Sequence, residues 1–65
     1  MADANLDSIQ WEFAMLTGLF EDAALIASEG QRVNSLDGTH RRSRRLSTTM
    51  QRIRRRMIIL EGCLQ

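Results

Sequence analysis

We predict an all-α fold for this chain: a two-helix antiparallel hairpin that dimerises into a four-helix bundle. The 65 residues contain no proline and four glycines, a composition that favours long helices over a turn-rich β fold. Two long segments carry apolar residues at alternating spacings of three and four. This spacing is typical of helices that pack along a seam. One short polar stretch separates the two segments.

The first helix is expected over about residues 5–29. Asp3 or Asn5 is the candidate N-cap, and Gly30 is the candidate residue that ends the helix. An unbroken three–four spacing predicts the seam that packs against the second helix. Its members are Leu6, Ile9, Phe13, Leu16, Phe20, Ala23 and Ala27.

The second helix is expected over about residues 38–63, with Asp37 or Ser35 as its N-cap. Between the helices lies a loop over about residues 30–37, in which Val33 and Leu36 are predicted to cover the end of the core. The chain is read as one domain, residues 1–65. The predicted seam of the second helix consists of Leu46, Met50, Ile53, Met57, Leu60 and Leu64.

A chain of this length needs a source of stability beyond its own core, because a domain of about 60 residues buries only about 60% of its unfolded surface. A single cysteine excludes an internal disulfide. A single cysteine and a single histidine together supply too few ligands for a zinc site within one chain. A homodimer is the simplest remaining solution. In length and layout it resembles the Rop type of RNA-binding hairpin dimer, with which it shares no sequence motif.

The first helix carries a second apolar sector, roughly 120° from its seam. We interpret this sector as the homodimer interface. The alternative is that it docks a protein partner, as an adaptor or anti-activator would. Its members are Trp11, Met15, Leu19 and Ile26.

Charge is distributed unevenly along the chain although the net charge is +1. Residues 1–30 contain six acids and no basic residue, whereas residues 31–65 contain all nine arginines and two acids. Lysine is absent. Such a division indicates either a basic surface for a polyanion or two halves that neutralise each other.

Six arginines of the second helix fall within about 120° of one another, roughly opposite its seam. Several lie in the first turns, where cations oppose the helix dipole and repel each other. No acidic residue between positions 38 and 60 compensates them. We therefore expect an external anion, the phosphate backbone of DNA or RNA, to bind this arginine stripe. The stripe consists of Arg41, Arg44, Arg45, Arg52, Arg55 and Arg56. Arg42 and Arg54 flank the seam and are expected to pair with acids on neighbouring helices.

Nothing in the sequence indicates catalysis. His40 is the only histidine and has no nucleophile at a suitable spacing, and the scattered glycines form no phosphate-binding loop. We expect a non-enzymatic regulatory or binding protein without cofactor or metal. The apolar runs are too short to span a membrane. The acidic N-terminus lacks secretory character, so a cytoplasmic location is expected.

Overall fold

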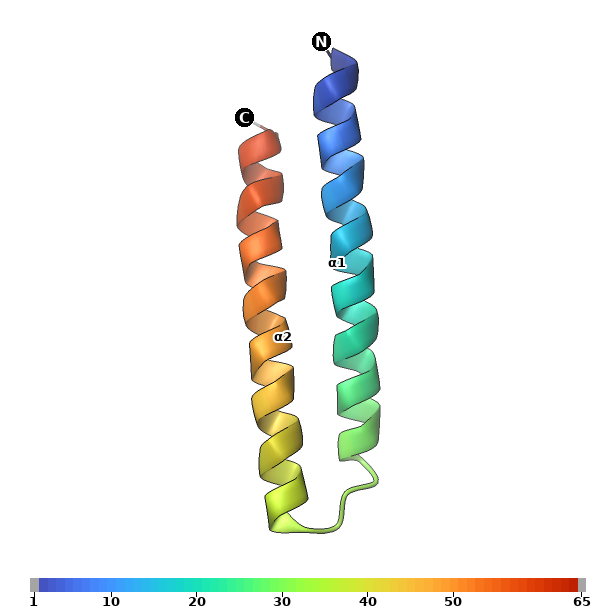
Figure 1. Ribbon diagram of the computed structural model, residues 1–65, viewed down its shortest axis with the longest axis vertical. Helices are drawn as coiled ribbons and strands as arrows, with labels where there is room; N and C mark the ends of the chain where they lie inside the picture. The colour runs from blue at the N-terminus through green and yellow to red at the C-terminus, as the bar shows by residue number, and fades with distance from the viewer. Residues whose placement is uncertain (1, 65) are drawn as a thin grey trace.

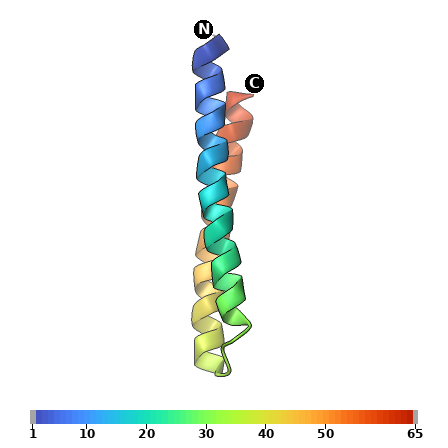
Figure 2. The ribbon, with the colours of Figure 1, turned by 90° about the vertical axis from the view of Figure 1, so that its right-hand side faces the viewer.

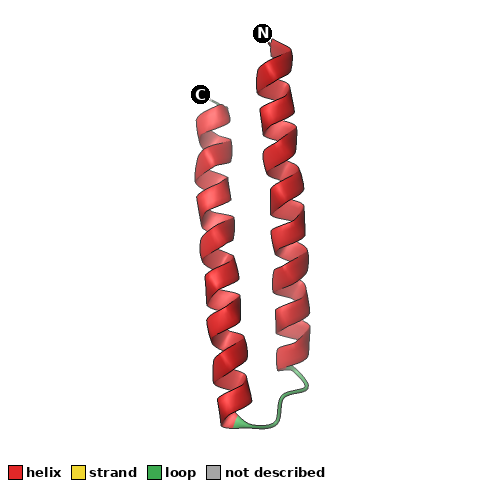
Figure 3. Ribbon diagram, viewed as in Figure 1, coloured by secondary structure: helices red, strands yellow, loops and turns green. Residues whose placement is uncertain are grey.

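The chain folds into two helices joined by a short loop (Figure 1). A computed structural model describes the backbone of residues 2–64 and the side chains of residues 6–64. Helix α1 spans Ala2–Gly30 and helix α2 spans Leu36–Cys63. The two helices run antiparallel and side by side in two perpendicular views (Figures 1 and 2). They pack against each other. The predicted all-helical hairpin is confirmed (Figure 3).

The end of α1 differs from the expected glycine cap. No glycine in residues 2–64 has a positive φ, so Gly30 does not adopt the left-handed conformation of a C′ glycine. The amide of Gln31 instead donates to the carbonyl of Ser28 at 3.2 Å, and that of Arg32 donates to Glu29 at 3.0 Å. These bonds tighten the last turn and satisfy two of its free carbonyls, those of Ser28 and Glu29. At the other end α1 begins at Ala2, so Asp3 and Asn5 lie inside the helix rather than capping it.

The start of α2 is fixed by Ser35. This residue has an extended backbone, and its Oγ accepts a hydrogen bond from the amide of Gly38 at 3.1 Å. Of the two predicted caps, Ser35 is therefore the correct one, while Asp37 lies in the first turn. Val33 is partly buried beside Gly38. Leu36 is 73% exposed and does not cover the core, contrary to expectation.

The core is a single seam between the helices. Leu16, Ile53 and Leu60 form its centre, and Ile9, Leu19 and Ala23 pack against them. The remaining inward positions are Glu12 and Ile26 of α1 and Leu46, Thr49, Arg56 and Cys63 of α2.

This seam is rotated relative to the predicted one. Phe13 and Phe20 are 55% and 53% exposed, and Leu6, Met50, Met57 and Leu64 also lie on the surface. The prediction was therefore wrong for these six residues, and also for Ala27, which is exposed. The physical reason is that α1 is apolar over two neighbouring sectors. The seam follows the boundary between them, which places Glu12 opposite Arg56.

Neither helix, over residues 2–64, contains a stretch apolar enough and long enough to cross a bilayer. The fold is thus a long, thin hairpin, with principal extents of 53 × 15 × 9 Å. In such a shape most positions of both helices face outward. The distribution of charged and apolar side chains over its sides therefore decides what the molecule can bind.

Candidate functional site

Five of the six residues of the predicted arginine stripe are exposed on α2. The sixth, Arg56, turns toward α1, where its Nη1 lies 3.2 Å from Oε1 of Glu12. The rotation of the seam explains this change, because it moves position 56 from the outer surface into the contact between helices. We call the five exposed residues the arginine face: Arg41, Arg44, Arg45, Arg52 and Arg55.

One acid of α1 partly neutralises the loop end of this surface. Oε2 of Glu29 lies 3.1 Å from Nε of Arg42 and 3.6 Å from Nη1 of Arg45. The pairing expected for Arg42 is therefore present, although this nitrogen is not aligned for a hydrogen bond. Arg54 is exposed and pairs with no acid among the side chains of residues 6–64. One carboxylate thus serves two arginines.

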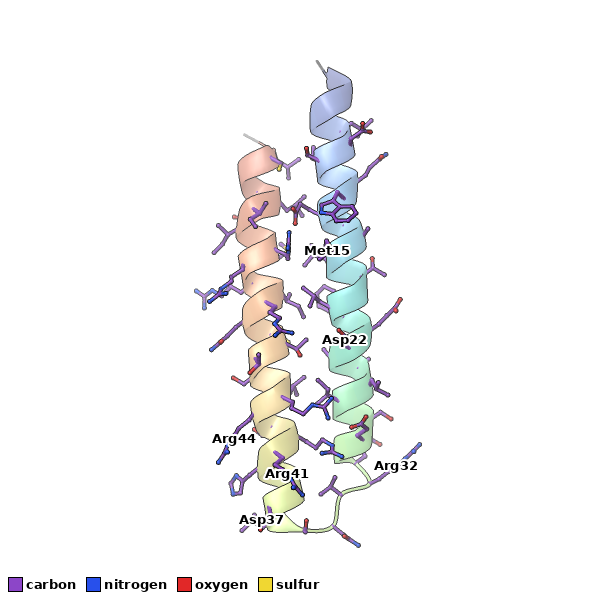
Figure 4. The ribbon with its side chains drawn as sticks, viewed as in Figure 1. Met15, Asp22, Arg32, Asp37, Arg41 and Arg44 are labelled. Atoms are coloured by element: carbon purple, nitrogen blue, oxygen red, sulfur yellow. The ribbon has the colours of Figure 1, made fainter. Side chains whose placement is uncertain are left out.

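Four members of the arginine face have no acidic partner within the part of the chain whose side chains are described: Arg41, Arg44, Arg52 and Arg55. Figure 4 shows Arg44 pointing away from α1, and Arg32 projecting from the loop. Because α2 holds no acid between Gly38 and Leu60, its outer surface carries uncompensated positive charge.

A shallow groove follows the arginine face on the side facing α1. Asp22, Arg45, Thr48 and Arg52 lie along it, together with the apolar edges of Leu25 and Ile26. The hydroxyls of Thr48 and Thr49 donate to the carbonyls of Arg44 and Arg45, each at 3.1 Å. Asp22 repels an anion inside the groove. The outer edge of the face is therefore the better place for a phosphate.

The four residues of the predicted interface do not form one surface. Trp11 is 61% exposed and Met15 is partly buried, whereas Leu19 packs against the core and Ile26 is 5% exposed. Two of the four therefore contribute to the hairpin's own seam. The structure instead exposes large apolar residues that the three–four spacing had assigned to the core. The sequence signal for this exposure is that α1 carries two neighbouring apolar sectors, only one of which can face α2.

Side chains suited to catalysis or metal binding are sparse. Over residues 6–64, no three histidine, cysteine or acidic side chains come together as a metal site would require. His40 lies on the surface near Asp37, Arg41 and Arg44. Cys63 is a free thiol, partly buried at the open end of the hairpin. The arrangement supports binding by charge and by apolar contact.

No family model, curated protein or solved structure matches the chain. Its function is therefore inferred from the surfaces of the hairpin itself.

Proposed function

We propose that this chain is a non-enzymatic binding protein that acts as a homodimer and holds a nucleic-acid backbone against its arginine face. The observation that carries the proposal is the set of four arginines without an acidic partner on the outer surface of α2. Guanidinium groups bind phosphate oxygens in a bidentate manner. Phosphate contacts of this kind supply most of the affinity of sequence-independent nucleic-acid binding.

The dimensions of the face suit a duplex. From Arg41 to Arg55 the helix rises about 21 Å, at about 1.5 Å per residue. A duplex carries one charge for about every 1.7 Å of its axis, so the face spans several phosphates along a groove edge or an RNA stem. Between Leu36 and Cys63 there is no phenylalanine, tyrosine or tryptophan, and His40 is the one ring that could stack on a base. Recognition by backbone and shape, common to DNA and RNA, is therefore favoured over reading of single-stranded bases.

A second candidate is a protein-interaction adaptor that docks through α1. The observation that favours it is the exposure of Trp11 and Leu25, at 61% and 59%, outside the core. Exposed tryptophan in an apolar patch is a common mark of a contact surface. Leu19 and Ile26 would take no direct part, because they already pack within the hairpin.

Binding to labelled duplex DNA and to a hairpin RNA across a salt series tests the proposal. We expect the logarithm of the affinity for duplex DNA to fall with the logarithm of salt, with a slope of about −3 to −4 if about four phosphates are neutralised. A comparison of the two ligands shows which duplex fits the face better. Absence of binding to both at about 50 mM salt would overturn the proposal and leave the adaptor as the better candidate.

Adjacent arginines provide a matched pair of variants. Arg55→Glu alters the arginine face, and we expect affinity to fall more than about tenfold, as for the loss of a charge-assisted phosphate contact. Arg54→Glu makes the same charge change at a residue that lines a groove with Met50 rather than with the arginine face. At a protein concentration where this variant sediments as the unaltered chain does, the expected loss is less than about threefold. Equal losses for both variants would mean that the overall charge of the chain, rather than this face, attracts the ligand.

A further inference from the structure

One side of the hairpin presents a row of large apolar side chains to solvent. On each helix they recur every seven residues, and all but Leu6 follow an inward-facing position by four residues. Their exposure ranges from 38% for Met57 to 64% for Leu64. We call this row the apolar flank: Leu6, Phe13 and Phe20 of α1 with Met50, Met57 and Leu64 of α2.

The two halves of the flank lie on the same side of the molecule. When two helices pack antiparallel, residues at equivalent heptad positions of the two helices lie on the same side of the seam. Ala27 and Ser43 continue the two series toward the loop, and both line one shallow groove between the helices. The charged residues Asp22, Arg45 and Arg52 line a different groove. The hairpin thus has one side on which apolar residues predominate, with Arg42 and Arg54 at its edge, and one charged side.

The register places the members of the flank in pairs. Glu12 and Arg56 are joined across the seam, and the next residue of each helix belongs to the flank. Phe13 therefore lies level with Met57. One heptad further toward the loop Phe20 lies level with Met50, and one heptad toward the open end Leu6 lies level with Leu64. The result is a continuous apolar strip along most of the hairpin.

The hairpin exposes more surface than a compact protein of its size. Its accessible area is 5286 Å², whereas a folded monomer of this mass is expected to expose about 4,200 Å². Its radius of gyration is 15.3 Å, against about 11 Å for a compact domain of this length. No large side chain in residues 6–64 is less than 2% exposed. The excess of about 1,000 Å² is close to the area of about 800 Å² that each partner buries in a standard interface.

We propose that a second copy of this chain covers the apolar flank, flank against flank about a twofold axis. None of the six side chains is charged, and Arg54, which lines a groove with Met50, is exposed at the edge of the flank. Two flanks can therefore meet while this guanidinium stays in solvent. At about 100 Å² for each half-exposed side chain, they supply about 600 Å² per protomer before their polar neighbours are counted. A twofold contact also closes on itself and leaves neither flank exposed.

This inference rests on the homodimer of the proposed function and specifies its interface. It places the contact at Phe13 and Phe20 rather than at the predicted Trp11 sector. The arginine face borders the other side of the seam, so both copies keep it open to a ligand.

Oxidation of the methionines by dilute peroxide tests the interface on the unaltered chain. In a single hairpin Met50 is 48% exposed and Met57 is 38% exposed, whereas Met15 is partly buried. Met50 above all should therefore oxidise faster than Met15. In the proposed dimer Met50 and Met57 are buried, whereas Met15 lies on the charged side. We therefore expect Met15 to oxidise faster than both at dimer concentrations, and the order to reverse on dilution. A dimer in which Met50 and Met57 remain the faster pair would overturn the proposed interface.

Matched substitutions on α1 provide a second test. Phe20→Glu introduces a charge on the flank, and Leu25→Glu introduces the same charge at a residue of similar exposure outside it. We expect Phe20→Glu to raise the dimer dissociation constant at least about 30-fold, as the loss of an interface hot spot does. Leu25→Glu should change it less than about threefold. Sedimentation equilibrium measures both, and circular dichroism follows the helix content.

The outcomes separate this inference from the rest of the proposed function. Loss of the dimer, or of dimer and helix together, in Phe20→Glu alone supports the flank. Loss in Leu25→Glu alone overturns it and identifies the Trp11 side as the interface. A monomeric unaltered chain overturns both the dimer and the flank. Binding of nucleic acid is measured separately by the salt series, so its failure cannot be mistaken for either result.

Discussion

Nη1 of Arg56 lies 3.2 Å from Oε1 and 3.3 Å from Oε2 of Glu12, across the seam between α1 and α2. Glu12 is 6% exposed, although it is a charged residue in a mostly apolar row. A slide of one heptad would place this carboxylate near Thr49 or Cys63 and leave it without a cation. Leaving a buried charge unpaired is strongly unfavourable, so this pair selects one register of the hairpin.

Arg56→Met should lower the stability of the fold by about 2–3 kcal/mol, because it leaves the Glu12 carboxylate buried and unpaired. The double variant Glu12→Leu/Arg56→Met should be more stable than Arg56→Met alone, since it removes both charges together. Urea unfolding at one fixed protein concentration measures both. If the single and double variants unfold at the same urea concentration, the ion pair does not hold the register.

Gly38→Ala should destabilise the hairpin by about 1–3 kcal/mol through overpacking. A Cβ at this position would lie 2.5 Å from Cγ1 of Val33 and 2.9 Å from Oγ of Ser35, the cap of α2. Gly18→Ala is the matched control, because a Cβ there meets no atom within 4 Å. Helix propensity predicts a gain of up to about 1 kcal/mol at position 18. Thermal unfolding should therefore shift in opposite directions, and a shift in the same direction would contradict this account of Gly38.

Ser35→Ala should cost about 1 kcal/mol, since it removes the side-chain acceptor for the amide of Gly38. Ser35→Asp should retain most of the stability because aspartate also caps helices well. Ser47→Ala, at an exposed position inside α2, serves as the control and should not destabilise the helix. Guanidinium unfolding of the three variants tests the order. A cost at Ser47 equal to that at Ser35 would exclude a capping role.

Thr49→Val should stabilise the fold by about 0.5–1 kcal/mol. Thr49 is 6% exposed in the seam, and its hydroxyl donates only to the carbonyl of Arg45 within its own helix. Valine retains the shape and adds an apolar methyl group to the core. Thr48→Val makes the same change at an exposed neighbour and should alter stability by less than about 0.5 kcal/mol. A destabilised Thr49→Val variant would show that the hydroxyl is needed where it lies.

Projection of the sequence onto a helix predicted most of the arginine face correctly. Arg41, Arg44, Arg45, Arg52 and Arg55 are exposed where the projection placed them, because the sector opposite any seam on α2 must face solvent. Arg56 lies at the edge of that sector, and a small rotation of the seam was enough to move it against Glu12. Residues at the edge of a sector are therefore the ones that periodicity assigns least well.

The sequence by itself determined the two helices and their antiparallel connection, because these depend on local spacing and on the short loop. It narrowed the cap of α2 to Asp37 or Ser35, and the structure selected Ser35. It also determined that α2 is strongly basic. Which edge of α1 meets α2 was decided only by the tertiary structure. Two apolar sectors of α1 compete for that place, and the choice depends on groups far apart in the chain. The contacts of Glu12 with Arg56 and of Glu29 with Arg42 are part of the seam that leaves Phe13 and Phe20 outside. An ion pair across 44 residues has no local signature, since its free energy arises only when both helices are in register.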